Sequence, residues 1–221
     1  MTRCLGPSMG TAFTRALVAT CCLLAPTQAQ AQTRTVVFRG FGDVGASTFT
    51  AEQSFKAILG SRSGMVFGGG VEAVLPQRIF VAIRASHFRK TGERVSIVNG
   101  AQFGLGIPTT ITLTPVEMTG GFRFDVASRL VPYAGAGVGW HRFRESSEFA
   151  EDNENVDKRF TGFHVIGGAE FRLLRWIGAA GEVQWATVPD AIGDDPNSVS
   201  HEFNESDLGG VTLRVKVVVG R

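Results

Sequence analysis

The last stretch of the chain, Leu208–Val219, alternates between apolar and polar side chains. Valine or leucine recurs at every second position after Gly210, and Thr212, Arg214 and Lys216 stand between them. Successive side chains of a β-strand point to opposite faces, so one face of this segment is apolar and the other carries full charges. This pattern is typical of a strand that faces lipid on one side and a polar interior on the other.

Similar alternation recurs along the chain and predicts eight strands. They are Thr35–Val44, Met65–Leu75, Ile79–Lys90, Thr110–Val126, Pro132–Arg144, Phe160–Leu173, Ile177–Thr187 and Leu208–Val219. A short helix over Glu52–Leu59 is predicted between the first two strands, because Phe55, Ile58 and Leu59 recur at helical spacing.

The predicted connections alternate in length. Three are short, around Pro76–Arg78, Ala127–Val131 and Leu174–Trp176. Four are long: Gly45–Gly64, Thr91–Thr109, Glu145–Arg159 and Val188–Asp207. Short turns on one rim and long loops on the other are the pattern of outer-membrane barrels, with the short turns periplasmic.

The polar faces of the predicted strands collect six acidic and six basic side chains. They are Arg39, Asp43, Glu72, Arg84, Glu117, Arg123, Asp125, Glu170, Arg172, Glu182, Arg214 and Lys216. Charges in a low-dielectric interior must be paired, or each costs several kcal/mol. We therefore expect a salt-bridged lumen filled with side chains, since eight strands enclose little more space than that. The alternative is that these charges lie on the solvated face of an open sheet.

Aromatic residues and one proline refine this picture. Tyr133, Trp140, Trp176 and Trp185 lie near predicted strand ends, where interfacial aromatic girdles are found. Pro115 falls within the fourth predicted strand and predicts a bend or bulge there. The 28 glycines of the chain would make room for large side chains inside a small barrel.

The first 31 residues have the pattern of a secretory signal peptide. Arg3 and Arg15 supply positive charge, Ala16–Ala25 is an apolar run, and Ala29–Ala31 offers a cleavage site before Gln32. The predicted barrel domain is then residues 32–221. Removal of the signal peptide takes Arg3 and Arg15 away and leaves 20 basic against 20 acidic residues. The net charge of the predicted mature chain therefore gives no argument for nucleic-acid binding.

No arrangement of chemical groups predicts a cofactor, a metal or a catalytic site. The four histidines lack metal-binding spacing, and the glycine-rich runs alternate along strands instead of opening a helix. All three cysteines fall within the predicted signal peptide. One enzymatic alternative stays open, a hydrolase using His141 or His164 with Ser146 or Ser147 and Glu145.

Several motifs together resemble a known family. They are Phe67–Glu72, Thr114–Glu117 with Gly121–Phe124, Pro132–Trp140, Gly167–Glu170 and Gly209–Arg214. Over nearly all of residues 35–221 the chain is similar to small bacterial outer-membrane β-barrel proteins of the OmpA/OmpX/OmpW-like type. The resemblance implies a location in the cell outer membrane, contact with outer-membrane lipid and lipopolysaccharide, and assembly by the barrel-insertion machinery. Family members include envelope stabilisers, adhesins, small-molecule channels and lipid enzymes.

We therefore predict an all-β fold, an eight-stranded antiparallel up-and-down transmembrane β-barrel with short periplasmic turns and long extracellular loops. We expect it to be non-enzymatic, with a structural or surface-interaction role in the envelope. Its expected partners exclude nucleic acid, and its oligomeric state is left open. The alternatives are a narrow channel for small hydrophobic or ionic solutes, a lipid A-modifying hydrolase, and a soluble lipocalin-like binder.

Overall fold

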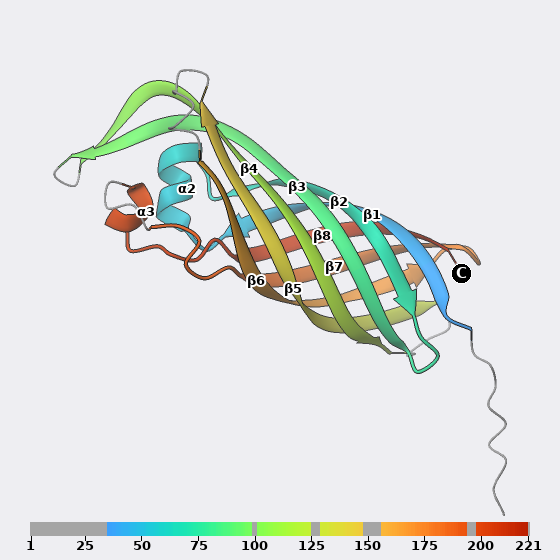
Figure 1. Cartoon of the computed structure of the whole chain (residues 1–221). Helices are drawn as coiled ribbons and strands as arrows, with labels where there is room; N and C mark the ends of the chain where they lie inside the picture. Colours follow the sequence, from blue (N-terminus) through green and yellow to red (C-terminus); the bar gives the residue numbers. More distant parts are fainter. Residues whose placement is uncertain (1–34, 99–100, 125–128, 148–155, 194–197, 221) are drawn as a thin grey trace, which may run out of the picture. The chain divides into compact units, whose positions relative to one another are not determined.

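Eight strands form one closed barrel in the computed structural model, which describes residues 35–98, 101–124, 129–147, 156–193 and 198–220 (Figure 1). Each strand pairs antiparallel with its neighbours in sequence, and the last pairs with the first. The strands are β1 (Val37–Phe49), β2 (Ser63–Val74), β3 (Ile79–Val98), β4 (Ala101–Arg123), β5 (Leu130–Ser147), β6 (Val156–Arg172), β7 (Ile177–Thr187) and β8 (Gly210–Gly220). The predicted up-and-down barrel is confirmed, whereas the predicted signal peptide lies outside the described residues.

Two helices lie in the long connections, at what we call the long-loop end of the barrel; the opposite end is the short-turn end. Helix α2 (Glu52–Leu59) has the predicted bounds, and α3 (Val199–Glu202) was not predicted. Within the described ranges, neither helix has the length and hydropathy of a membrane span.

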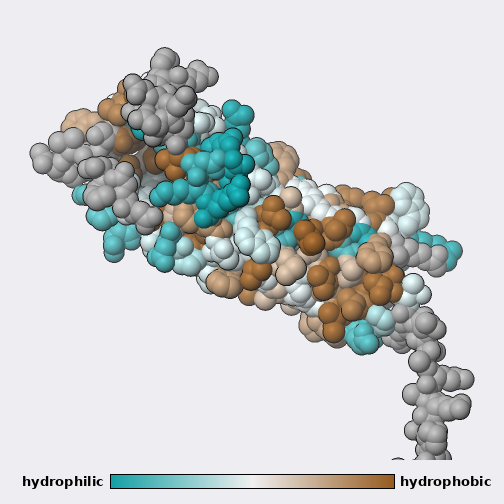
Figure 2. Space-filling view, viewed as in Figure 1, coloured by the Kyte–Doolittle hydropathy of each residue, from teal (hydrophilic) through white to brown (hydrophobic). Residues whose placement is uncertain are grey.

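Large apolar side chains cover the outside of the barrel wall. Phe67 and Val215, for example, are 58% and 62% exposed. On the face seen in Figure 2, hydrophobic side chains gather over the barrel and hydrophilic ones over the long-loop end. An apolar surface that encircles the barrel far exceeds the patches of about 300–600 Å² found on soluble monomers. Its outward apolar face is therefore suited to hydrocarbon.

The predicted aromatic positions divide between the two faces of the wall. Trp140, Trp176 and Trp185 are exposed, as an interfacial girdle requires. The prediction for Tyr133 is wrong, because its side chain is 4% exposed and hydrogen-bonds inside the barrel. Proximity to a strand end did not reveal which face the residue occupies.

The second long connection, predicted over Thr91–Thr109, is wrong as a loop. Strands β3 and β4 continue through almost all of it as a paired hairpin, with Val98 opposite Ala101. The register shifts between Glu93 and Val95, and the surplus residues lie on β4. Pro108 is tolerated within this hairpin because β4 pairs with β5 only from Thr109 onward, which leaves the hairpin tip an edge.

The strand register has no bulge at Pro115, so that part of the prediction is wrong, whereas a bend there stays a prediction. The pairs Ala85–Val116 and Phe88–Leu113 have the same register on either side of the proline. Pro115 itself pairs with His141 of β5 without a shift.

Glycines stand beside the large aromatic side chains of the barrel interior. A Cβ at Gly70 would lie 2.8 Å from the ring of Phe41, and one at Gly121 would lie 2.5 Å from the ring of Phe80. A Cβ at Gly168 would lie 2.7 Å from the Tyr133 hydroxyl. The interior therefore accommodates its aromatic rings because the neighbouring positions lack side chains.

We expect Gly168→Ala to lower the free energy of unfolding by roughly 1–3 kcal/mol, the usual cost of overpacking. The added methyl would meet Tyr133 and, at 2.6 Å, the carbonyl oxygen of Gly181. Urea unfolding in lipid vesicles measures the effect. Gly167→Ala is the matched control, since a Cβ there has nothing within 4 Å. Equal midpoints for the two variants would contradict the prediction.

Candidate functional site: the charged lumen

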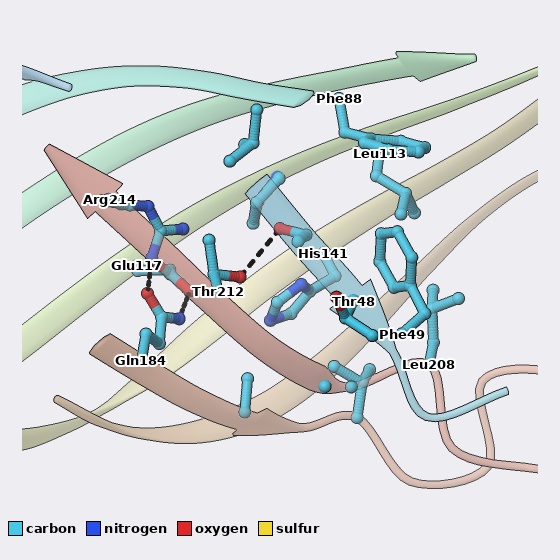
Figure 3. A pocket seen from close by; sticks show the side chains of 17 residues that line it. Thr48, Phe49, Phe88, Leu113, Glu117, His141, Gln184, Leu208, Thr212 and Arg214 are labelled. Carbon is cyan, nitrogen blue, oxygen red and sulfur yellow. Dashed lines mark hydrogen bonds between the residues drawn. The ribbon is translucent and has the colours of Figure 1, made fainter. Parts of the chain in front are cut away.

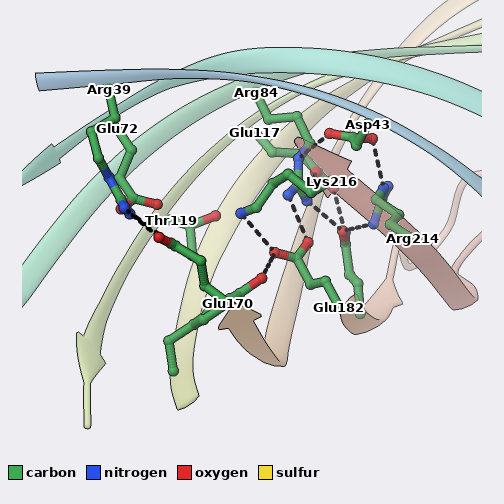
Figure 4. A network of polar contacts seen from close by, with 12 residues as sticks. Arg39, Asp43, Glu72, Arg84, Glu117, Thr119, Glu170, Glu182, Arg214 and Lys216 are labelled. Atoms are coloured by element: carbon green, nitrogen blue, oxygen red, sulfur yellow. Dashed lines mark hydrogen bonds and ion pairs between the residues drawn. The ribbon is translucent and has the colours of Figure 1, made fainter. Parts of the chain in front are cut away.

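The barrel interior gathers most of the charged residues predicted to lie there. Ten of the twelve have side chains in the interior and join ion pairs or hydrogen bonds across it: Arg39, Asp43, Glu72, Arg84, Glu117, Arg123, Glu170, Glu182, Arg214 and Lys216 (Figure 4). Arg172 is instead exposed at the short-turn end of β6. Asp125 lies outside the described residues. The described set contains five acids and five bases.

Four of these side chains form a closed ring near the short-turn end, which we call the arginine–glutamate ring. Arg39 contacts Glu72, its partner across β1 and β2, and reaches Glu170 of β6 at 2.9 Å. Arg123 of β4 reaches the same two carboxylates, at 3.1 Å to Glu72 and 2.6 Å to Glu170. Each side chain therefore has two partners of opposite charge. The ring is neutral as a unit and ties together β1, β2, β4 and β6.

A second group lies farther toward the long-loop end and centres on Arg84 of β3. Its guanidinium lies 2.6 Å from Glu182 and 3.3 Å from Asp43. Arg214 lies 3.4 Å from the other oxygen of Asp43, and Lys216 lies 3.2 Å from Glu182. The carboxylate of Asp43 is completely buried between two arginines, and burial of that kind is stable only because the charges compensate.

Polar side chains without full charge extend this second group. Gln184 donates to Glu117 at 2.5 Å and accepts from Arg214 and Arg84. His164 lies 3.9 Å from Glu117 and hydrogen-bonds to the Thr119 hydroxyl at 2.8 Å. These contacts add hydrogen bonds to the ion pairs, although some buried atoms of the group, among them Nδ1 of His164 and Oε2 of Glu117, have no hydrogen-bond partner among the described residues.

Two aromatic rings fill the space between the charged groups. Lys216 lies 4.6 Å from the ring centroid of Phe41 and 5.0 Å from that of Tyr133, within the range of cation–π attraction. Arg84 also lies over Phe41. The Tyr133 hydroxyl donates to Glu182 at 2.9 Å. Aromatic and ionic contacts therefore form one packed layer across the barrel.

A small cavity lies between this layer and the long-loop end (Figure 3). Its volume is about 60 Å³. Glu117, Gln184 and Arg214 line one side, while Phe88 and Leu113 line the other. This volume accommodates a few water molecules.

An apolar cap closes over the small cavity. Helix α2 turns its Phe55 and Leu59 inward, where they pack with buried side chains of the barrel wall and of the last long connection. Phe55 stacks on Phe49 at 4.3 Å between ring centroids. The buried members of this cap are Ala51, Phe55, Leu59, Phe88, Ile111, Leu113, Phe143, Val188, Ala191 and Leu208.

The cap is held in place by a contact between two long connections. Glu205 accepts hydrogen bonds from the backbone nitrogens of Gln53 and Ser54, both at 2.9 Å, and from the Ser54 hydroxyl at 2.6 Å. Helix α2 has no side-chain cap from its own N-cap residue, Ala51. A residue about 150 positions away therefore satisfies the first turn of the helix and places a negative charge at its positive end.

The exposed side of α2 carries an ionic contact of its own. Glu52 bonds Lys56 at 2.5 Å and also contacts Arg62. The hydrogen bond from Lys56 holds the pKa of the Glu52 carboxyl below its usual value. This pair is solvent-exposed, so we assign the docking of α2 to its apolar face and to Glu205.

A larger cavity of about 410 Å³ opens at the short-turn end. Arg39, Arg123 and Glu170 of the arginine–glutamate ring lie on its lining, with Arg172 and Arg175 at the rim. No residue lines both this cavity and the small one. The two charged groups and the two aromatic rings occupy the interior between them.

Sequence reasoning missed some interior residues and placed others without their partners. Alternation places Gln184 and His164 on the polar faces of their strands, but it does not reveal their contacts across the barrel. Phe41 and Phe80 were missed, and Tyr133 was assigned to the interfacial girdle instead of the interior. The signal that could have found them is the clustering of glycines on neighbouring strands, at Gly70, Gly121 and Gly168 among others.

An eight-stranded barrel with an apolar outside and a neutralised polar lumen is the architecture of small outer-membrane proteins. The family described as outer membrane protein beta-barrel domain matches residues 16–204. The chain belongs to this family, and its fold is of the small OmpA/OmpX-like type. The family places it in the outer membrane. A comparison with curated proteins found no match.

Solved structures agree with this assignment of the fold. A major outer membrane protein from Thermus thermophilus is similar with a TM-score of 0.56 at 11% identity, over 85% of this chain and 100% of that one. Neisserial surface protein A is similar with a TM-score of 0.52 at 13% identity, over 84% and 98%. Ail, the attachment invasion locus protein of Yersinia pestis, gives 0.51 at 11% identity, over 84% and 98%.

We expect Glu170→Gln to destabilise the barrel strongly, by about 3–5 kcal/mol, because it breaks a buried ion pair from one side. Arg39 and Arg123 would then share the single charge of Glu72. The urea midpoint in vesicles measures this change. Glu52→Gln, which removes one charge from an exposed pair, serves as control and should leave the midpoint unchanged. Similar midpoints for both variants would argue against the ring as a source of stability.

We expect Glu205→Gln to loosen helix α2, because a neutral amide is a weaker acceptor for the first turn. Loss of such a cap costs about 1 kcal/mol, equivalent to a roughly fivefold larger undocked population. Trypsin cleavage after Lys56 or Arg62 on intact cells should accelerate by that factor. Glu202→Gln, in α3, is the control. An unchanged cleavage rate in Glu205→Gln would show that the cap does not depend on this contact.

Proposed function

We propose that this protein is a non-enzymatic outer-membrane barrel with a closed lumen and a structural or surface-interaction role in the envelope. The observation that carries the proposal is the filling of the lumen by two neutral groups of charged side chains. Five acids and five bases compensate one another across it. Such side chains are held by partners on several strands, so moving one aside to admit a solute would break buried ion pairs.

The cavities support a closed lumen. The small cavity and the cavity at the short-turn end share no lining residue, and the layer around Arg84 and Tyr133 lies between them. The apolar cap adds a second obstruction at the long-loop end. A hydrated ion would therefore meet two barriers of different chemistry, one ionic and one apolar.

The geometry gives less support to a lipid hydrolase. His164 is buried in the lumen with its Nε2 bonded to Thr119. His141 lines the small cavity, whose volume of about 60 Å³ is too small for an acyl chain. His141 also belongs to the lining of a groove on the outer surface, but that lining contains neither serine nor Glu145 of the hydrolase alternative.

The β3–β4 hairpin supports a role at the cell surface. The chain carries no charged residue from Val95 to Val116, and Phe103 and Leu105 in this hairpin are 52% and 48% exposed. Exposed apolar side chains on a projecting element are typical of protein contact sites.

We include in the proposal that the chain is exported by cleavage of residues 1–31 and inserted by the barrel-assembly machinery.

Conductance of the purified barrel in planar lipid bilayers tests the closed lumen. We expect no steady unitary currents from the wild-type protein. Arg84→Ala combined with Glu205→Gln should produce openings, because it removes the central ionic contacts and loosens the cap. Arg89→Ala combined with Glu202→Gln is the matched control, since Arg89 lies on the same strand but is exposed. Steady currents from the folded wild-type protein would identify a channel and overturn the proposal.

A further inference from the structure

The outer wall of the barrel changes from apolar to basic over one step of β5. Trp140 faces outward, with Val116 of β4 and Thr161 of β6 as its cross-strand partners. One step farther toward the long-loop end, Arg142 lies between Thr114 and Arg159. Residues two apart on a strand are separated by about 7 Å, so the arginines lie directly beyond the tryptophan. Tryptophan marks the membrane–water boundary in such barrels, which places the arginines at headgroup level.

These residues enclose a groove on the outer surface. Its volume is about 410 Å³, and its lining includes Val116 and Trp140 at one end and Arg142 and Arg159 at the other. Thr114 and Thr161 add hydroxyl groups along its sides. The groove is therefore amphipathic along the membrane normal, with its apolar end toward the hydrocarbon.

The positive charge of the groove is only partly compensated within the described part of the chain. Arg142 binds Asp157 through two hydrogen bonds, at 2.8 and 2.5 Å, and Arg144 binds the same carboxylate at 3.1 Å. Arg159 makes no hydrogen bond or ion pair among the described residues, although it stands directly opposite Arg142 across β5 and β6. Like charges in directly opposed positions destabilise a sheet. Three arginines therefore share one carboxylate where an anion would relieve their repulsion.

We propose that this groove binds a phosphorylated, acylated glycolipid of the outer leaflet, the lipid A portion of lipopolysaccharide. Arg142 and Arg159 hold a phosphate group of the sugar headgroup, and an acyl chain lies against Val116 and Trp140. Guanidinium groups suit a phosphate because their N–H donors form charge-assisted, often bidentate, hydrogen bonds. The proposal depends on the outer-membrane location but not on the closed lumen, so a conducting barrel would leave it intact.

Two features favour this ligand over a simple anionic phospholipid. The groove lies on the side of the long connections, which is the outer face of such barrels and the leaflet that contains lipopolysaccharide. Its lining carries two threonines beside the two arginines, which suits a headgroup that combines phosphate with sugar hydroxyls. A phospholipid such as phosphatidylglycerol carries a phosphodiester with one negative charge, whereas a phosphate monoester of lipid A carries about −1.5 to −2 and so better matches two arginines.

Equilibrium binding of fluorescent bis-phosphorylated lipid A to the full folded chain in neutral detergent micelles tests the proposal. We expect the wild-type protein to bind this lipid at least about tenfold more tightly than dephosphorylated lipid A or phosphatidylglycerol. Removal of one charge-assisted hydrogen bond lowers an affinity by about this factor. Arg142→Gln with Arg159→Gln should reduce binding to the level of the dephosphorylated lipid. Arg159→Lys should retain part of the affinity, because it keeps the charge without the planar donors.

Arg62→Gln with Arg175→Gln is the matched control, because it removes the same charge from exposed positions outside the groove. Heat-modifiable gel migration verifies that every variant is folded, and Arg159→Gln alone provides a variant that breaks no hydrogen bond or ion pair within the described part of the chain. Undiminished binding by the folded Arg142/Arg159 variant would overturn the proposal. Equal affinity for phosphatidylglycerol, or for dephosphorylated lipid A, would overturn it as well, in favour of a general anionic or a purely apolar surface.

Discussion

The structure depends on one constraint, that every charge directed into the lumen must meet an opposite charge there. A side-chain period of two sends half of each strand inward, and an eight-stranded barrel has little room for water. The ten buried charges divide into a ring of two acids and two bases and a second group of three acids and three bases. Strand register is part of this solution, because a shift of one residue would turn Arg39 outward and leave Glu72 without its partner.

Charge balance also imposes a volume requirement, because long ion-paired side chains must fit beside aromatic rings in the same section of the barrel. Phe41 and Tyr133 contact the cations directly, and Phe80 packs against Tyr133. Each ring lies where a neighbouring strand has glycine, at Gly70, Gly121 or Gly168. The glycine content of the wall and the charge content of the lumen are therefore two consequences of the same packing problem. Together they explain why the two lumen cavities are separate.

Alternation alone predicted the number of strands, their order and the direction of most charged side chains, because those properties depend only on neighbouring residues. It could not predict that Arg39 meets Glu170, since that contact crosses the barrel and depends on strand tilt and register. Helix α2 was predicted with correct bounds from local spacing, whereas its cap by Glu205 joins distant connections. The hairpin over Thr91–Thr109 was missed because its successive residues 103–106 are all exposed, so no alternation of apolar and polar faces marks a strand there.

The same side chain has opposite roles on the two faces of the wall. Inside, an arginine without a carboxylate would cost several kcal/mol, so each of Arg39, Arg84 and Arg123 has at least two acidic partners. At the hydrated boundary outside, an uncompensated charge costs little, and Arg159 persists there without a partner among the described residues. A lumen whose charges cancel has little net attraction for an ion. The capacity of this barrel for electrostatic recognition therefore lies on its outer surface, where charge can remain uncompensated.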